Sequence, residues 1–288
     1  MRAYLPDYQL RTASSLDEAV KLLAGEPGRW RPIAGGTDLM VLLEAGKLPH
    51  RHLLSLWGLP ELRGITATDG HLTLGALTTY TEMQADPVLR DEFPMLCEAA
   101  SWTGSVAIQN RGTLGGNIAN ASPAADSLPA LLVYEAELEI VSARDSQWVA
   151  YRDFHTGYKT MLLREDQLIK SIRLPRATRG WNQRTRKVGT RKAQAISKVC
   201  LAAMIRRSPG QHDQIEDIRL AYGSVAPVPI RAAGTEAFLR GRPVDALTIE
   251  AAGRELAAEL SPIDDLRSTA EYRLRVAVNL LGDFLRQA

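Results

Sequence analysis

The stretch RPIAGGTDLM, residues 31–40, joins a short apolar run to a second apolar run through two adjacent glycines. Glycine has no Cβ, so successive backbone N–H groups in such a loop can converge on an anion. Thr37 adds a hydroxyl donor beside these amides. The pattern predicts a short strand, a glycine loop and a second apolar segment, with anion binding as the chemistry of the loop.

A second stretch, RGTLGGNI at residues 111–118, has the same adjacent glycines with Thr113 and Asn117 beside them. Two such loops in one chain suit a ligand with two phosphates, such as a dinucleotide. Neither loop is a G-x-G-x-x-G or a Walker sequence, so a Rossmann or P-loop site is not predicted. The structural alternative is that each glycine pair only allows a tight turn.

Composition sets the limits on what the chain can be. With 288 residues, 45% of them hydrophobic, it can form two domains with a sizeable core. The net charge of +2 argues against a protein devoted to nucleic-acid binding. Two cysteines, Cys97 and Cys200, cannot hold an iron–sulfur cluster, and no metal-ligand spacing is present. No signal sequence or membrane span is expected, which favours a cytoplasmic location.

The order of predicted elements divides the chain near residue 175. Residues 1–58 are predicted to form a small α/β lobe, with a helix over 17–24 capped by Ser14 or Ser15 and strands at 31–33 and 52–56. Residues 59–175 are richer in strands, and residues 176–288 contain two apolar strands followed by helices. Within these parts we predict strands at 71–76, 137–141, 167–174, 198–206 and 217–225, and helices at 79–84, 94–100, 128–133 and over much of 232–288.

A basic stretch opens the last part of the chain. Residues 167–212 contain twelve Lys or Arg and no Asp or Glu, with Lys187, Arg191 and Lys192 near the middle. One interpretation is a site for phosphates or an electron-rich ring. The other is a solvated face or one that binds nucleic acid, although Trp181 is the only aromatic residue there to stack on a base.

No catalytic residue is predicted. The sequence has no Ser–His–Asp order, paired-carboxylate motif or reactive thiol. His155, near Tyr151 and Phe154, is interpreted as a hydrogen-bonded structural residue. A chain without its own acid–base groups is typical of a cofactor carrier.

The two glycine stretches and three further segments together resemble a known family. The further segments are LGALTT at 74–79, residues 187–199 and AYGSVAP at 221–227, and the second glycine stretch continues as ANASPAAD to residue 126. In order and spacing they resemble the FAD-binding (medium) subunit of the molybdenum hydroxylase family, of the xanthine dehydrogenase and carbon monoxide dehydrogenase type. The resemblance implies an α+β fold. A two-lobed FAD-binding domain of the vanillyl-alcohol-oxidase (PCMH) type would span 1–175, with lobes of about 1–58 and 59–175. An α+β C-terminal domain of the carbon monoxide dehydrogenase flavoprotein type would span 176–288.

By the same resemblance, the chain binds FAD and two loops hold its pyrophosphate through backbone amides. The first loop comprises Pro32, Ile33, Ala34, Gly35, Gly36, Thr37, Asp38 and Leu39, and the second Thr113, Leu114, Gly115, Gly116 and Asn117. Four further residues are expected at the cofactor: Thr103, Asp126, Ile169 and Lys187. Thr103 and Ala195 depart from the residues of some relatives, which leaves NAD, a quinone, a carrier protein or oxygen open as the acceptor.

The resemblance also implies partner chains. A small subunit would carry [2Fe-2S] clusters and a large one the molybdopterin, assembled as a dimer of heterotrimers. This chain would pass electrons from the clusters to NAD or another acceptor, with xanthine or a purine as the first candidate substrate. Other N-heteroaromatic, aldehyde or carbon monoxide dehydrogenases are the alternatives within the family. Outside it, the chain could be a self-contained flavin oxidase, or an anion- or nucleic-acid-binding protein using residues 167–212.

Overall fold

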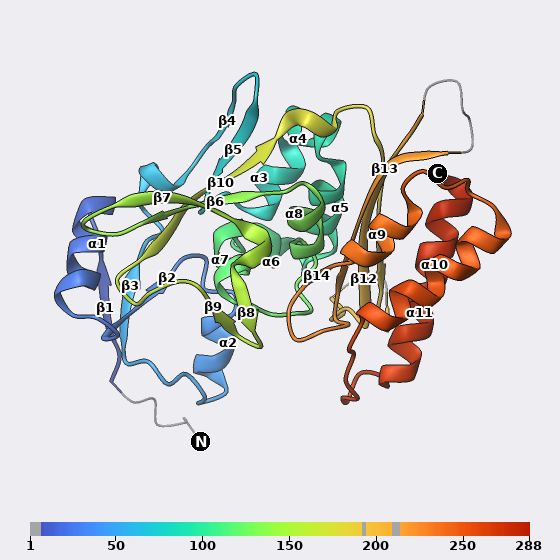
Figure 1. Cartoon of the computed structure of the whole chain (residues 1–288). Coiled ribbons are helices and arrows are strands. Elements are labelled where there is room, and N and C mark those ends of the chain that lie inside the picture. The colour runs from blue at the N-terminus through green and yellow to red at the C-terminus, as the bar shows by residue number, and fades with distance from the viewer. Residues whose placement is uncertain (1–6, 192–193, 209–213) are drawn as a thin grey trace.

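The computed structural model describes residues 7–191, 194–208 and 214–288. This part of the chain forms a three-stranded, a five-stranded and a four-stranded sheet, together with a small hairpin. Figure 1 shows the chain running from the first lobe around α1, through a central group of helices, to the C-terminal helices on the opposite side. The mixture of helices and sheets is the α+β architecture predicted from the sequence.

The first lobe is a parallel sheet in the order β1 (Gln9–Thr12), β3 (His52–Ser55) and β2 (Trp30–Ile33). Helix α1 (Leu16–Gly25) connects β1 to β2, and Ser15 caps it by accepting a hydrogen bond from the Glu18 N–H at 3.1 Å. The helix buries Ala19, Val20 and Leu23. A 3-10 turn, η1 (Pro60–Leu62), leads to the second lobe.

Helix α2 (Leu39–Glu44) follows the first glycine loop and differs from α1 in its burial. Five of its six residues are apolar, yet none of the six is buried. Met40 and Val41 are 49% and 61% exposed. This short helix therefore presents apolar surface that the described residues do not cover.

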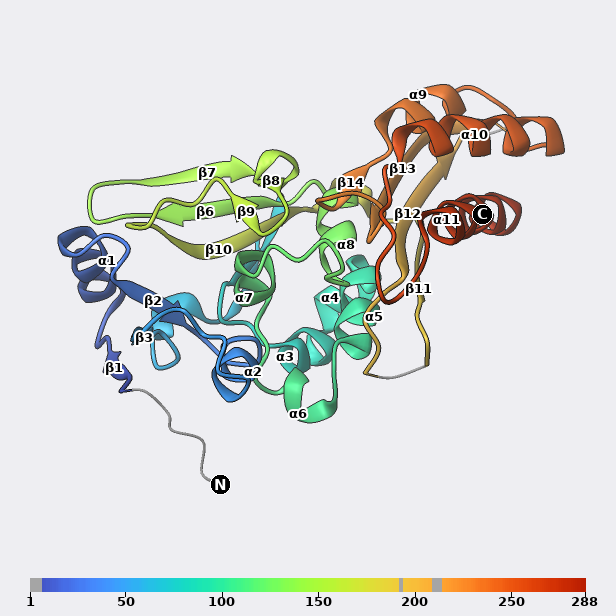
Figure 2. The ribbon, with the colours of Figure 1, turned by 90° about the horizontal axis from the view of Figure 1, so that it is seen from below.

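The second lobe is an antiparallel sheet packed against helices. Its strand order is β4 (Ile65–Ala67), β5 (His71–Gly75), β10 (Leu168–Pro175), β6 (Glu137–Val141) and β7 (Ser146–Ala150). The helices are α3 (Tyr80–Ala85), α4 (Pro87–Glu92), α5 (Pro94–Trp102), α6 (Val106–Gln109), α7 (Leu114–Ala119) and α8 (Leu128–Val133). A 3-10 turn, η2 (Tyr151–Asp153), precedes a hairpin of β8 (His155–Gly157) and β9 (Thr160–Met161). In the view of Figure 2, β2 and β3 of the first lobe face β10, with α7 beside them.

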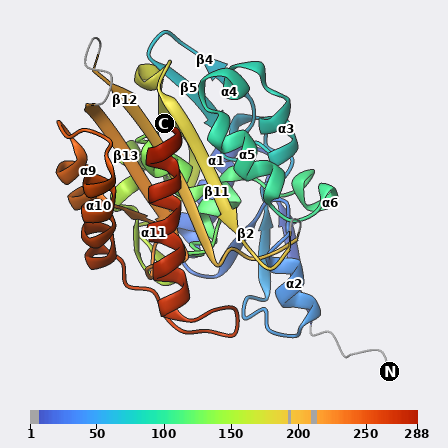
Figure 3. The same cartoon turned by 90° about the vertical axis from the view of Figure 1, so that its right-hand side faces the viewer.

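The C-terminal part follows the 3-10 turn η3 (Arg176–Thr178) and has an antiparallel sheet covered on both faces. The strand order is β11 (Asn182–Val188), β12 (Val199–Arg207), β13 (Ile215–Gly223) and β14 (Ile230–Arg231). The helices are α9 (Ala233–Leu239), α10 (Ala246–Glu259) and α11 (Ala270–Gln287). Figure 3 shows α11 crossing the outer face of this sheet while α5 lies beside β11.

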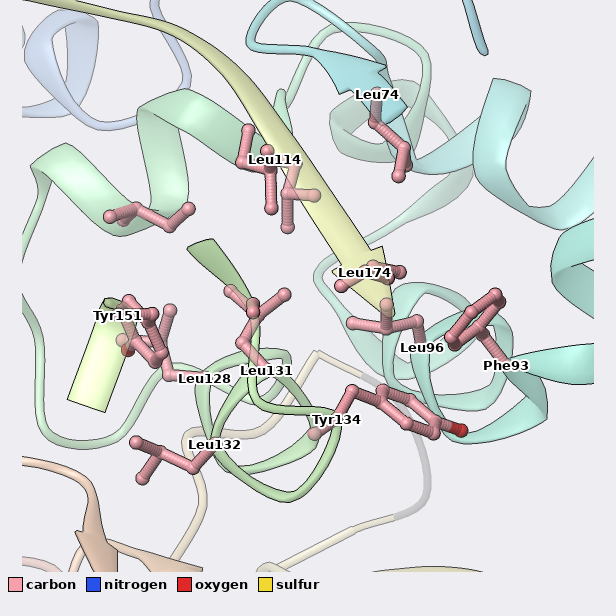
Figure 4. Close-up of a cluster of buried hydrophobic side chains, with 14 of the residues drawn as sticks. Leu74, Phe93, Leu96, Leu114, Leu128, Leu131, Leu132, Tyr134, Tyr151 and Leu174 are labelled. Carbon is pink, nitrogen blue, oxygen red and sulfur yellow. The ribbon is translucent and has the colours of Figure 1, made fainter. Parts of the chain in front are cut away.

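Burial on both faces explains the continuous apolar run in β12. Leu201 and Ala203 belong to the core beneath α10 and α11, whereas Ala202 and Met204 belong to the core of the second lobe. That second-lobe core surrounds α8 and includes Leu114, Leu131 and Tyr134 (Figure 4). The C-terminal sheet is thus packed directly against the second lobe.

Several predicted elements agree with the structure, and one interpretation is corrected. The predicted helix at 128–133 and strand at 137–141 have the bounds of α8 and β6. The second glycine stretch is not an open loop: Thr113 caps α7, and both glycines lie in its first turn. Strand β11 was not predicted, because its charged residues hide any alternation. None of the helices in the described part of the chain has the length and hydropathy that a bilayer span requires.

Candidate functional site

A cavity of about 440 Å³ lies at the junction of the two N-terminal lobes. The first glycine loop, the start of α7 and the start of β10 line it. Small-molecule and cofactor sites have cavities of about 300–1,000 Å³. The cavity therefore has the size of a cofactor site, and the two glycine stretches meet there.

Gly35 lets the first loop approach the segment that leads to α7. A Cβ at Gly35 would lie 1.6 Å from the Arg111 carbonyl oxygen, so no other residue fits without moving the backbone. Gly36 has a different role, because its φ of +78° is in the left-handed region that favours glycine. One glycine thus permits a close contact between two loops, and the next permits a turn.

The first loop keeps its backbone N–H groups available. The amides of residues 34–38 donate to no acceptor elsewhere in the described chain, although the Gly36 carbonyl accepts from Met40. Buried or half-buried amides are normally hydrogen-bonded, so a run of five without a protein partner requires water or a ligand. Since residues 34–38 all line the cavity, their N–H groups are suited to an anionic ligand.

The second stretch differs, because four of its five backbone amides already have acceptors in the chain, which corrects the prediction for residues 114–117. The Leu114 and Gly115 N–H groups donate to the Thr78 and Ala76 carbonyls, at 3.0 and 2.9 Å. The Gly116 N–H donates to Thr113 Oγ1 at 3.1 Å, which is the capping bond of α7. The Asn117 N–H donates to the Thr113 carbonyl. These four amides hold α7 and its N-cap to the segment that follows β5 and to each other. The side chains of this stretch remain for a ligand, together with the Thr113 N–H, which has no acceptor in the described chain.

Two side chains of the second stretch can still donate into the cavity, which both of them line. Asn117 accepts a hydrogen bond through Oδ1 from Ser127 Oγ at 2.5 Å, which leaves the side-chain N–H groups of Asn117 for a ligand. The Thr113 hydroxyl accepts from Gly116 and keeps its own hydrogen to donate. Gly115 lets α7 pack closely against Ala76, because a Cβ at Gly115 would lie 2.6 Å from the Ala76 Cβ.

Asp126 and Lys187 form a buried ion pair behind one end of the cavity. Lys187 Nζ lies 2.5 Å from Asp126 Oδ2, and the two side chains are 9% and 7% exposed. Lys187 also donates to the Trp102 carbonyl at 3.2 Å, and Ser197 donates to Asp126 at 2.6 Å. The pKa of Asp126 is raised, because burial disfavours the carboxylate by more than Lys187 and Ser197 favour it.

The cavity lining includes most of the predicted residues. Fourteen of the seventeen line it, from Pro32 to Leu39, at Thr103, at Thr113, from Gly115 to Asn117 and at Ile169. Leu114 does not, because its side chain is fully buried in the second-lobe core and its amide is hydrogen-bonded to Thr78. Asp126 and Lys187 lie outside the lining, as does Ala195. Asp126 and Lys187 adjoin the cavity through two of its lining residues, Tyr80 and Thr103. Burial and the Asp126 charge raise the pKa of Tyr80, and Lys187 donates to the carbonyl of Trp102, the residue before Thr103.

Sequence reasoning missed several lining residues. They include Gly28, Trp30, Arg31, His50, Tyr80, Ile108, Gly112, Asn120, Met161, Leu163, Arg164, Glu165, Gln167 and Leu168. Gly112 could have been found from its position next to Thr113 in the second glycine stretch. In the structure a Cβ at Gly112 would lie 2.8 Å from the Tyr80 ring, so the close approach of this ring depends on glycine. The segment before β10 has no comparable signal, because only the folded sheet brings it to the cavity.

The basic stretch does not form a uniform positive face. At least six of its cations form ion pairs with carboxylates from outside the stretch: Lys170, Arg173, Arg176, Arg179, Lys187 and Arg206. Lys192 and residues 209–212 lie outside the described residues. The observed pairing removes the feature on which the nucleic-acid interpretation depended.

His155 has the structural role predicted for it. Its Nε2 hydrogen-bonds the Ile118 carbonyl at 2.9 Å and its Nδ1 the Tyr151 hydroxyl at 3.3 Å. Burial lowers the pKa of His155. Across the described residues, no three His, Cys, Asp or Glu side chains gather as metal ligands.

Comparison with known proteins agrees with this geometry. Residues 6–177 match the model of the FAD binding domain in molybdopterin dehydrogenase, and residues 184–288 match that of the CO dehydrogenase flavoprotein C-terminal domain. The chain is 34% identical over 278 residues to the xanthine dehydrogenase FAD-binding subunit of Escherichia coli O157:H7, covering 96% of this chain and 94% of the relative. It is 30% identical over 274 residues to the glyceraldehyde dehydrogenase medium chain of Sulfolobus acidocaldarius, covering 95% of each.

A solved structure shares the fold. The carbon monoxide dehydrogenase of Hydrogenophaga pseudoflava superposes with a TM-score of 0.91 at 28% identity, over 96% of each chain. The family models together span both parts of the chain and the cavity described above. The chain therefore belongs to the FAD-binding subunits of the molybdenum hydroxylase family, of the xanthine and carbon monoxide dehydrogenase type.

Proposed function

We propose that the cavity between the two lobes is the FAD site and that the first loop holds the diphosphate. The single observation that supports this most is the run of five cavity-lining amides, residues 34–38, without a protein acceptor in the described chain. The close contact at Gly35, which a Cβ would prevent, supports it further. Residues of both lobes line the cavity, as a ligand bound between the lobes requires.

The remaining predicted residues have distinct proposed roles. Thr113 and Asn117 would donate from their side chains, while Gly115 and Gly116 would keep α7 close to β5. Ile169 and Thr103 would contact the cofactor from β10 and the end of α5. Asp126 and Lys187 would act at the end of the cavity near Tyr80, and Leu114 would serve only the core. Bound flavin supplies electron transfer, which none of these side chains provides.

The complex we propose is a multi-subunit molybdenum hydroxylase in which this chain transfers electrons. Xanthine or a purine is the first candidate substrate, supported by the 34% identity to a xanthine dehydrogenase subunit. An aldehyde, carbon monoxide or another N-heteroaromatic compound is the alternative, since the glyceraldehyde dehydrogenase relative is nearly as similar. Within the chain we propose an FAD-binding domain at 1–175, with its two lobes, and a C-terminal domain at 176–288.

Partner chains complete the proposal. The described residues offer no cluster of metal ligands, so [2Fe-2S] clusters would belong to a small subunit and the molybdopterin to a large one. The unburied apolar residues of α2, whose first residue lines the cavity, suit contact with such a partner. We propose a dimer of heterotrimers that passes electrons to NAD or another acceptor. Both cysteines are free, which supports a reducing compartment such as the cytoplasm.

The experiment is to express the chain with its genomic neighbours, purify the assembly, and record absorption spectra before and after acid release of the cofactor. We expect about one FAD per copy of this chain, with iron–sulfur absorbance from the co-purifying chains. Reduction of NAD with xanthine, glyceraldehyde or carbon monoxide then distinguishes the substrates. A folded complex without FAD would refute the proposal.

A further inference from the structure

Trp57 lies where the chain leaves the first lobe, two residues after the end of β3 and before η1. Two arginines of the second lobe contact its ring. The centroid of the ring lies 4.6 Å from Arg63 Cζ and 3.8 Å from Arg111 Cζ. A cation within about 6 Å of an indole centroid is attracted by the π electrons of the ring. Two cation–π contacts therefore join the end of the first lobe to the second lobe.

Arg63 fixes the backbone of Trp57 as well as its ring. Its Nη2 donates to the Trp57 carbonyl at 2.8 Å, and its Nη1 lies 3.9 Å from Glu82 Oε1. Glu82 forms the capping box of α3 with Thr79, and Thr79 pairs in a β-bridge with Thr113 at the start of α7. Trp57 is thus held by the part of the second lobe that also holds α7.

Arg111 connects the two lobes at two points. Its carbonyl oxygen lies where a Cβ of Gly35 would be, and its guanidinium contacts the Trp57 ring. In the described chain this guanidinium has no carboxylate or hydrogen-bond acceptor, so its position depends on the ring. Gly35 and Gly112, on either side of the backbone contact, both line the cavity. The side chain of Arg111 therefore anchors a residue whose backbone sets the distance between the glycine stretches.

The spacing of the lobes matters because a ligand in the cavity meets both of them. Leu56, Leu62, Leu77 and Leu168 belong to a core shared by the lobes and also line the cavity. This core joins the lobes at one wall, whereas the free amides of the first loop and the side chains of the second stretch lie on different lobes. Hydrogen bonds need donor–acceptor distances of about 2.7–3.2 Å, so a ligand bonded from both lobes requires a fixed spacing.

We propose that Trp57 and Arg111 are positioning residues whose stack sets how tightly the cavity retains FAD. This inference rests on the proposed FAD site. Neither residue lines the cavity, so the stack would act on the ligand through the Gly35–Arg111 backbone contact. Without the stack, a fraction of the molecules would hold the two stretches apart. The apparent dissociation constant would then rise by the inverse of the fraction that can bind.

The test uses the full chain, freed of cofactor, with Arg111→Met, Trp57→Leu, the double variant and Arg111→Lys. A matched control is the stack of Arg173 on Trp148, at 4.1 Å, because both of its residues lie in the second lobe. Arg173→Met also loses an ion pair with Glu137, so this control reports any general effect of lower stability. The dissociation constant and dissociation rate of FAD are measured, together with the unfolding temperature without ligand.

We expect Arg111→Met and Trp57→Leu each to weaken FAD binding about three- to fivefold, the effect of a cation–π contact near the surface, mainly through faster dissociation. The double variant should bind no more weakly than Trp57→Leu alone, because one stack is lost in both. Arg111→Lys should retain most of the affinity, since an ammonium group is also attracted by the ring. Arg173→Met should keep the wild-type dissociation constant while its unfolding temperature falls.

The other outcomes separate the two proposals. A wild-type chain that binds no FAD would refute the proposed function, and this inference with it. If the wild type binds FAD and both stack variants bind it equally well, the positioning role is refuted and the FAD site stands. Additive losses in the double variant, or an equal loss of affinity in Arg173→Met, would show that the stack has no specific role and would overturn the inference.

Discussion

Substitution of Gly35 by alanine tests whether contact between the two glycine stretches builds the site. The new Cβ would lie 1.6 Å from the Arg111 carbonyl oxygen, whereas ordinary contact begins at 3.4 Å. The backbones at Gly35 and Arg111 must therefore separate by about 1.8 Å. The atoms that the new Cβ would meet all belong to the Arg111 backbone, so no flexible side chain can move to relieve the contact. Gly35 is not among the residues with positive φ, so the effect is steric rather than torsional.

Overpacking of this kind costs about 3 kcal/mol when backbone must move. For a part of the chain of this size we expect the unfolding temperature to fall by about 6–12 °C. FAD content should fall as well, because the amides of residues 34–38 would move away from Thr113 and Asn117 across the cavity. Differential scanning calorimetry and the flavin-to-protein absorbance ratio measure the two effects.

Two controls make the result specific. A Cβ at Gly58 would meet nothing within 4 Å, so Gly58→Ala should keep the wild-type stability and flavin content. At Gly36 the new Cβ would meet only side-chain atoms, Met40 Cγ at 3.2 Å and Ile33 Cδ1 at 3.6 Å, and the main cost would come from the positive φ, about 1 kcal/mol. Gly35→Ala should therefore be the more damaging of the two loop variants. Wild-type stability and full FAD content in Gly35→Ala would refute the reasoning.

Three further predictions concern residues around the cavity. Lys187→Met leaves Asp126 buried without its counter-ion and should lower the free energy of unfolding by about 3 kcal/mol in urea titrations. Adding Asp126→Asn should restore part of that loss, and a purely additive double variant would contradict the pairing. Leu114→Ala removes a fully buried side chain and should cost about 2–5 kcal/mol. Chain that remains folded should still bind FAD, and a selective loss of flavin would return Leu114 to the site. Burial lowers the pKa of His155 below its usual 6.5, so the folded chain should lose stability as pH falls through that value. His155→Gln should remove this part of the pH dependence in unfolding curves at several pH values, and identical pH profiles would count against it.

The sequence by itself determined where the site would lie along the chain. Adjacent glycines with polar neighbours are a local signal, because the freedom of a residue without a Cβ does not depend on distant contacts. The strands and helices around α8 and β6 were likewise predicted from local periodicity. Most of the predicted site residues line one cavity for this reason.

Only the tertiary structure decided what each glycine stretch does. The amides of residues 114–116 are used because the Thr78 and Ala76 carbonyls and the Thr113 hydroxyl accept their hydrogen bonds, whereas those of residues 34–38 find no acceptor within the described chain. Glycine is required at position 35 because the Arg111 carbonyl, 76 positions later in the sequence, occupies the place of a Cβ. Arg31 and Asn120 line the same cavity from separate parts of the chain, so no spacing in the sequence could associate them. A pattern fixes what a backbone is able to do, and the fold fixes which of its polar groups remain for a ligand.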